Sequence, residues 1–125
     1  MAIDNDLLLR DGTVALESTE ATPTAVDFGG PDLVPLTYVV DILEATDGTD
    51  ETLDVVIQGS ADNSTFVDIC TFPQITALTA KAQYMLEAIS DLRYRRAKMT
   101  VGGTDSPSFH GAMVYVCPAG RYLDK

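Results

Sequence analysis

Residues 53–72 read LDVVIQGSADNSTFVDICTF and decide the predicted fold. Leu53, Val55 and Ile57 recur at every second position, which is typical of a strand with one face in a core. Residues 59–64 are turn formers, because Gly and Asn tolerate positive φ, while Asp, Asn and Ser bond to nearby backbone. Residues 66–72 then resume a β-branched and aromatic pattern. The stretch therefore predicts a β-hairpin.

Outward from this hairpin, the chain shows further short apolar alternations separated by turn signals, and no helix of ordinary length. About eight strands spaced roughly 8–12 residues apart are typical of an antiparallel β-sandwich or barrel. We place a loop at Pro31 and Pro35, and a connection with room for a short turn of helix at 74–80. The expected strands cover residues 13–18, 24–28, 37–45, 53–58, 66–72, 81–89, 94–101 and 109–117.

Two regions are expected from the chain of 125 residues: an N-terminal arm at 1–12 and a single β-sandwich domain at 13–125. The arm carries Ile3, Leu7, Leu8 and Leu9, and it is too short for an independent helix. Terminal segments are ordered only when tied down. The arm is therefore expected to dock, either on its own domain or on a neighbouring subunit.

Charge is distributed unevenly along the chain, whose net charge is -11. Residues 1–68 hold 15 of the 19 acids and one base, whereas residues 69–125 hold four acids and seven bases. The overall acidity argues against nucleic acid and anionic membranes as partners. Against this background, Arg93, Arg95, Arg96 and Lys98 form a basic cluster. It predicts either a strand face that neutralises neighbouring acids or a contact surface for an acidic partner.

No run of apolar residues reaches the ~20 that a spanning helix needs, and residues 1–6 lack the features of a signal peptide. Cys70 and Cys117 lie on predicted strands with a spacing that fits no zinc motif. Buried free thiols are expected, although a disulfide between distant strands stays open.

A catalytic constellation is not evident in the sequence. His110 is the only histidine, and nothing around it supplies a nucleophile and an orienting acid. The acidic residues at 47–51 and the pair Asp62–Asn63 are interpreted as turns, because neither matches a calcium-loop spacing. We expect no enzyme activity, no cofactor and no metal.

The chain resembles the small jelly-roll cement, or decoration, proteins of tailed-bacteriophage heads. The likeness covers nearly the whole length: an opening MAID, the apolar strand LTYVVDI before a Gly/Thr/Asp loop, the hairpin LDVVIQGSADNSTFVDI, and LRYRRAKMTVGG before a final apolar strand. The resemblance implies a jelly-roll sandwich that is usually trimeric. It also implies a structural role without an active site, on the outer capsid surface.

From the resemblance, the expected partners are the major capsid protein and other copies in a homotrimer. The expected location is the virion surface after synthesis in the host cytoplasm. Neither nucleic acid nor membrane is expected to bind. The alternative is an all-β carbohydrate- or receptor-binding module of a virion or tail. Because the chain has no Trp, and because Tyr38, Phe66, Tyr84 and Tyr115 lie within predicted strands, a sugar platform is weakly supported.

Overall fold

A computed structural model describes residues 8–10, 25–28, 34–42, 44–46, 50, 52–76, 83–103, 108–110 and 112–118. Within these residues the protein is all-β, with no helix. The strands are β1 (Leu8–Arg10), β2 (Val26–Asp27), β3 (Val34–Asp41), β4 (Glu44–Thr46), β5 (Thr52–Ser60), β6 (Val67–Thr71), β7 (Ile75–Thr76), β8 (Gln83–Ser90), β9 (Tyr94–Gly102), β10 (Ser108–His110) and β11 (Met113–Pro118).

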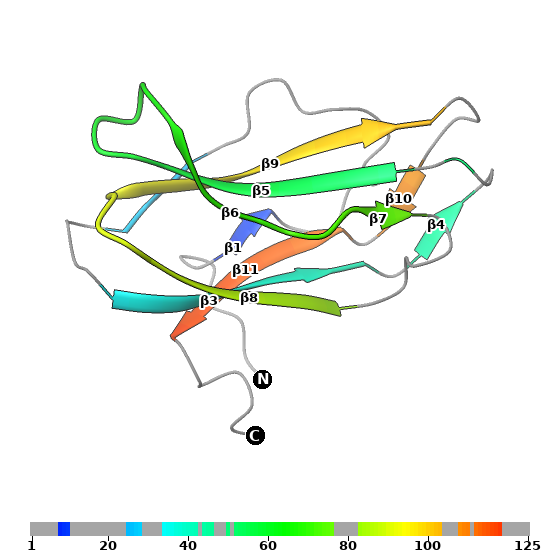
Figure 1. Ribbon diagram of the computed structural model, residues 1–125, viewed down its shortest axis with the longest axis horizontal. Coiled ribbons are helices and arrows are strands. Elements are labelled where there is room, and N and C mark those ends of the chain that lie inside the picture. The colour runs from blue at the N-terminus through cyan, green and yellow to red at the C-terminus, as the bar shows by residue number, and fades with distance from the viewer. Residues whose placement is uncertain are drawn as a thin grey trace.

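Two antiparallel sheets pack face to face and form a sandwich (Figure 1). Sheet A has the strand order β1-β11-β3-β8. Sheet C has the order β2-β9-β5-β6, with β7 also paired to β5. A third, small sheet B pairs β10 with β4 and lies at one end of the sandwich (Figure 1). The predicted all-β antiparallel sandwich is confirmed.

The connectivity is that of a jelly roll. Leaving aside the short strands β4, β7 and β10, the chain pairs its first strand with its last and continues inward in the same way. The antiparallel pairs are β1 with β11, β2 with β9, β3 with β8, and β5 with β6. Successive strands of this set change sheet, except β5 and β6, which are neighbours in sheet C. This is the arrangement of a double-sheet jelly roll.

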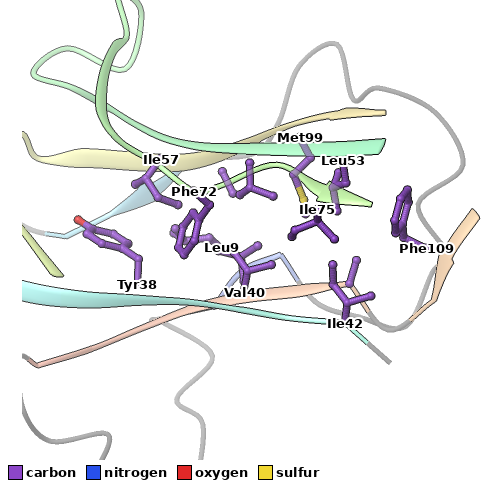
Figure 2. Packing of buried hydrophobic residues seen from close by; sticks show 14 of the residues in the cluster. Leu9, Tyr38, Val40, Ile42, Leu53, Ile57, Phe72, Ile75, Met99 and Phe109 are labelled. Carbon is purple, nitrogen blue, oxygen red and sulfur yellow. The ribbon is translucent and has the colours of Figure 1, made fainter. Parts of the chain in front are cut away.

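The hairpin at 53–72 supplies the centre of sheet C and much of the core. Leu53, Val55 and Ile57 on β5 are completely buried, as their alternation predicts. Phe72 follows β6 and is also buried. Figure 2 shows Ile57 and Phe72 near Tyr38 of the opposite sheet, and Leu53 farther along the same core. Burial of a Val, Leu, Ile or Phe side chain contributes about 1.5–3 kcal/mol, so this layer dominates the stability of the sandwich.

A second apolar cluster lies on the face of sheet A that points away from the sandwich. It contains Val39, Tyr115 and Cys117, with Leu8 and Met113 packed against it. Val39 is 0% exposed although its strand neighbours Tyr38 and Val40 point into the main core. Both faces of β3 are therefore apolar and buried, and the alternation at 37–42 reflects two different hydrophobic environments.

Several boundaries differ from the sequence prediction. Strand β3 begins at Val34 and includes Pro35, which was expected in a loop. Pro35 pairs with Ile89 of β8 but lies beyond the last residue of β3 that pairs with β11, Leu36. A proline without a backbone N–H is tolerated at such a strand end. The predicted strand 37–45 is divided into β3 and β4, and part of the connection 74–80 forms strand β7.

Residues 8–10 of the predicted arm form β1, which pairs with β11. Strand 24–28 is confirmed as the short edge strand β2. The strand predicted at 13–18, the remainder of the arm and most of the acidic loop 47–51 lie outside the described residues.

Candidate interaction surface

The apolar residues of the predicted arm separate into different environments. Leu9 is 7% exposed and belongs to the main core, whereas Leu8 packs on the outward cluster beside its register partner Tyr115. Ile3 and Leu7 lie outside the described residues. Of the arm candidates, Leu9 is therefore occupied within its own domain and is not available to a partner.

Arg93 lies at the solvent surface and is neutralised locally. Its Nε and Nη2 atoms donate hydrogen bonds of 2.7 and 2.8 Å to the two carboxylate oxygens of Asp27. The two side chains are 45% and 43% exposed. The bond to Asp27 and its negative charge raise the pKa of Arg93 further above its ordinary value. This pair joins the start of β9 to the edge strand β2.

Arg95 corrects the sequence prediction, because its side chain is inside the protein rather than on the basic surface. It is 2% exposed. Nη1 donates to the Tyr38 hydroxyl, Nη2 donates to Ser90 O at 2.7 Å, and Nε donates to Leu92 O at 3.1 Å. The guanidinium carbon lies 5.0 Å from the centre of the Phe28 ring. Carbonyl and hydroxyl oxygens together with an aromatic face thus replace water around this cation.

The signal for this burial was present in the alternation of β9. Arg95 shares its strand face with Ala97 and Met99, which are both buried, whereas Arg96 and Lys98 share the opposite face. Charge suggested a surface, while periodicity indicated the interior. Periodicity prevails here because the oxygens that compensate the cation come from the end of β8, from the turn after it and from β3.

Arg96 is half-buried on the outward face of sheet C and is also held by neighbours. Its guanidinium carbon lies 3.8 Å from the centre of the Phe66 ring. Its Nε donates to Gln58 Oε1 at 2.9 Å, and Gln58 Nε2 donates to Asp68 Oδ1 at 3.0 Å. A polar chain therefore crosses β9, β5 and β6 and connects a cation to a carboxylate through one amide.

Lys98 is exposed on the same strand face as Arg96 and Thr100. It forms no ion pair with any residue that the structure describes. These three side chains define the β9 outer face. Of the four predicted basic residues, only Arg96 and Lys98 share this face, and Lys98 alone has no charge partner there among the described residues. The cluster is thus a partly neutralised sheet face rather than one continuous basic patch.

Strand β8 presents an exposed surface that the sequence analysis did not identify. Met85 and Ile89 are 43% and 58% exposed, and the exposed Glu87 lies between them on the same strand face. The period-2 pattern of residues 83–90 predicts this common face. Sequence alone does not show that β8 lies at the edge of sheet A, where no described strand covers its outer side.

The turn between β5 and β6 is built around Asp62. Its Oδ1 accepts hydrogen bonds from the Ser60 hydroxyl and from the backbone N–H groups of Ser64 and Thr65. The Thr65 amide, followed by the Ser60 hydroxyl and the Ser64 amide, lowers the pKa of Asp62. Asn63 has a φ of 60°, which Asn tolerates well. These bonds give the carboxylate a turn-forming role.

No group of three or more His, Cys, Asp or Glu residues able to hold a metal occurs in the described part of the chain. The backbone of His110 lies in β10. Cys70 and Cys117 are free thiols, and burial raises the pKa of Cys70 to about 11. No helix long and apolar enough to cross a membrane is found among the described residues.

The comparisons with known proteins give no match: neither a protein-family model nor a curated protein sequence is significantly similar to this chain.

Proposed function

We propose that this protein is a non-enzymatic structural protein that binds the outer surface of a tailed-phage capsid and clamps neighbouring major capsid subunits. The observation that carries the proposal is the nested jelly-roll pairing of β1 with β11, β2 with β9, β3 with β8 and β5 with β6. This is the topology that the sequence resemblance to phage cement proteins implies. Because jelly rolls host several functions, the resemblance supplies the choice among them.

The surface chemistry supports an attachment role. The exposed side chains of Met85, Ile89 and Lys98 lie on described outer faces and can contact a partner. A net charge of -11 keeps many copies soluble before they assemble. The proposed partners are the major capsid protein and two further copies in a homotrimer, at the virion surface.

The proposed mechanism is thermodynamic linkage. A protein that binds only the assembled shell stabilises that shell, and the effect of one site is multiplied over many equivalent sites. A trimer that contacts several capsid subunits at once also gains from multivalency, because the second and third contacts form at high effective concentration.

The test uses purified mature heads of the encoding phage that lack this protein. We expect the added protein to sediment with the heads and to raise the temperature at which they break and release DNA. The variant Lys98→Glu should bind less tightly, whereas Thr100→Glu on the same strand face serves as the control. Failure of the wild-type protein to bind any form of the head would overturn the proposal. Selective binding on a glycan array would instead favour the carbohydrate- or receptor-binding alternative.

A further inference from the structure

The four sheet edges of the sandwich are unequal. In sheet C, β2 has two residues, and β6 has five residues with a register shift opposite Ile57 and Gln58. In sheet A, the described part of β1 has three residues and a register shift. Short strands and bulges are the devices by which proteins prevent edge-to-edge pairing. Three of the four edges are therefore protected against adding another strand.

Strand β8 is the exception. It has eight residues, contains no proline, and pairs with β3 over its whole length without a register shift. Among the described strands it pairs with β3 alone, and it forms the lower front edge of the sandwich in Figure 1. A long, regular edge offers a row of backbone donors and acceptors to an incoming strand.

The side chains of this β8 edge (Gln83–Ser90) specify what an incoming strand would meet. Met85, Glu87 and Ile89 alternate along the outward face, so that an exposed carboxylate lies between two exposed apolar groups. Met85 and Ile89 are two of the three large hydrophobic residues that are exposed in the described part of the chain. Cross-strand partners of complementary type would bury the two apolar groups and neutralise Glu87.

A second copy of β8 is a poor occupant. In the symmetric antiparallel register that places Met85 opposite Ile89 of the other copy, Glu87 lies directly opposite Glu87. Like charges in directly opposed positions are destabilising. The same register would be favourable for a strand with Lys or Arg at the central position and apolar residues two positions away on each side.

We propose that the β8 edge is a β-augmentation site for an extended segment of a partner protein with an apolar–x–basic–x–apolar pattern. Backbone hydrogen bonds to β8 supply affinity, and the cation opposite Glu87 sets register and specificity. This inference rests on the proposed function in one respect: it takes the bound segment to be part of the capsid partner. Its test uses no capsid, so either proposal fails separately.

The Glu87→Lys variant tests whether a basic side chain opposite Glu87 allows two β8 edges to pair. In an equimolar mixture with wild-type protein, Lys at position 87 of one copy lies opposite Glu87 of the other in the apolar-matched register. At low salt, we expect sedimentation velocity to show a mixed complex that neither protein forms alone, and added salt should weaken it. Adding Ile89→Asp to the Glu87→Lys variant should abolish the complex.

The control is Thr100→Lys, which places a lysine on the exposed face of β9 and should form no complex with wild type. A second measurement uses a synthetic peptide, Thr-Val-Thr-Lys-Thr-Ile-Thr, in fluorescence anisotropy with wild-type protein. Exchange of its Lys for Glu should weaken binding by about 1.5- to fivefold, the range for a cross-strand charge pair. No mixed complex together with equal binding of the two peptides overturns the proposal.

Discussion

Arg95 Nη1 donates a hydrogen bond of 2.8 Å to the hydroxyl of Tyr38 and so connects β9 of sheet C with β3 of sheet A inside the sandwich. Burial raises the pKa of Tyr38, while the positive charge of Arg95 and its hydrogen bond act in the opposite direction. The neutral phenol therefore serves as an acceptor for the cation. The contact fixes the spacing of the two sheets near the β8–β9 turn.

Replacement of Arg95 by Met should destabilise the protein strongly. The variant removes the donor from three oxygens, those of Tyr38, Ser90 and Leu92, in a buried region. The expected loss of unfolding free energy is about 2–4 kcal/mol, from unsatisfied buried polar groups. Urea unfolding measures it. The control is Arg93→Met, whose exposed ion pair should contribute too little to resolve. Equal stability of the two variants would contradict the buried contact.

Gly59→Ala should also be destabilising, for a steric reason. An added Cβ would lie 2.7 Å from Ile69 Cδ1 and 2.8 Å from Leu92 Cδ1. Overpacking of this kind costs about 1–3 kcal/mol. Thermal unfolding should show the loss, and adding Leu92→Ala to Gly59→Ala should cost less than the sum of the two single changes. Strict additivity would show that the clash is not with Leu92.

Arg96 and Phe66 should show an energetic coupling in a double-mutant cycle. The guanidinium stacks on the ring at 3.8 Å and is half-buried, so the interaction is partly desolvated. The expected coupling between Arg96→Ala and Phe66→Ala is about 0.5–1 kcal/mol in urea unfolding. The pair Lys98 and Phe66 provides the control cycle, for which a coupling near zero is expected.

Stability should fall at alkaline pH through Cys70. Burial raises its pKa from an ordinary value of 9.0 to about 11, so folding favours the protonated thiol. This contribution is complete below pH 9 and is lost as pH rises from 9 to 11, because the unfolded chain ionises first. Unfolding free energies at about pH 8 and about pH 10.5 should therefore differ less in Cys70→Ala than in wild type. An identical pH dependence would show that Cys70 is not the group responsible.

Val39→Ala should behave as a core substitution although Val39 points away from the sandwich. Because Val39 is 0% exposed, the loss of its methyl groups should cost about 1–2 kcal/mol in urea unfolding. The control Ile89→Ala removes a side chain that is 58% exposed and should have a much smaller effect. Equal effects would indicate that the outward cluster does not contribute to stability.

The parts of the fold that follow local alternation could be read from the sequence. The alternation of Leu53, Val55 and Ile57 predicts a half-buried strand, and the turn residues after Ile57 predict a hairpin. The alternation of Val114 and Val116 with Tyr115 and Cys117 likewise predicts the last strand. These signals are local because strand periodicity and turn chemistry are local.

Features that depend on distant partners were not predictable in the same way. The alternation of β9 points Arg95 inward, but the oxygens of Tyr38, Ser90 and Leu92 that accommodate it are gathered only in the folded chain. The position of β8 at a sheet edge follows from the order of all the strands rather than from its own residues. Among the surface candidates, the sequence therefore identified Arg96 and Lys98 correctly as one strand face but did not find Met85 and Ile89.

The nested pairing also fixes the order in which the protein can be completed during synthesis. Leu8 is a register partner of Tyr115, so β1 cannot form this pair until residue 115 has left the ribosome. The innermost hairpin, β5–β6, has the shortest loop to close, and each outer pair must close a longer one. Folding should thus be slow, as expected for a chain dominated by non-local contacts.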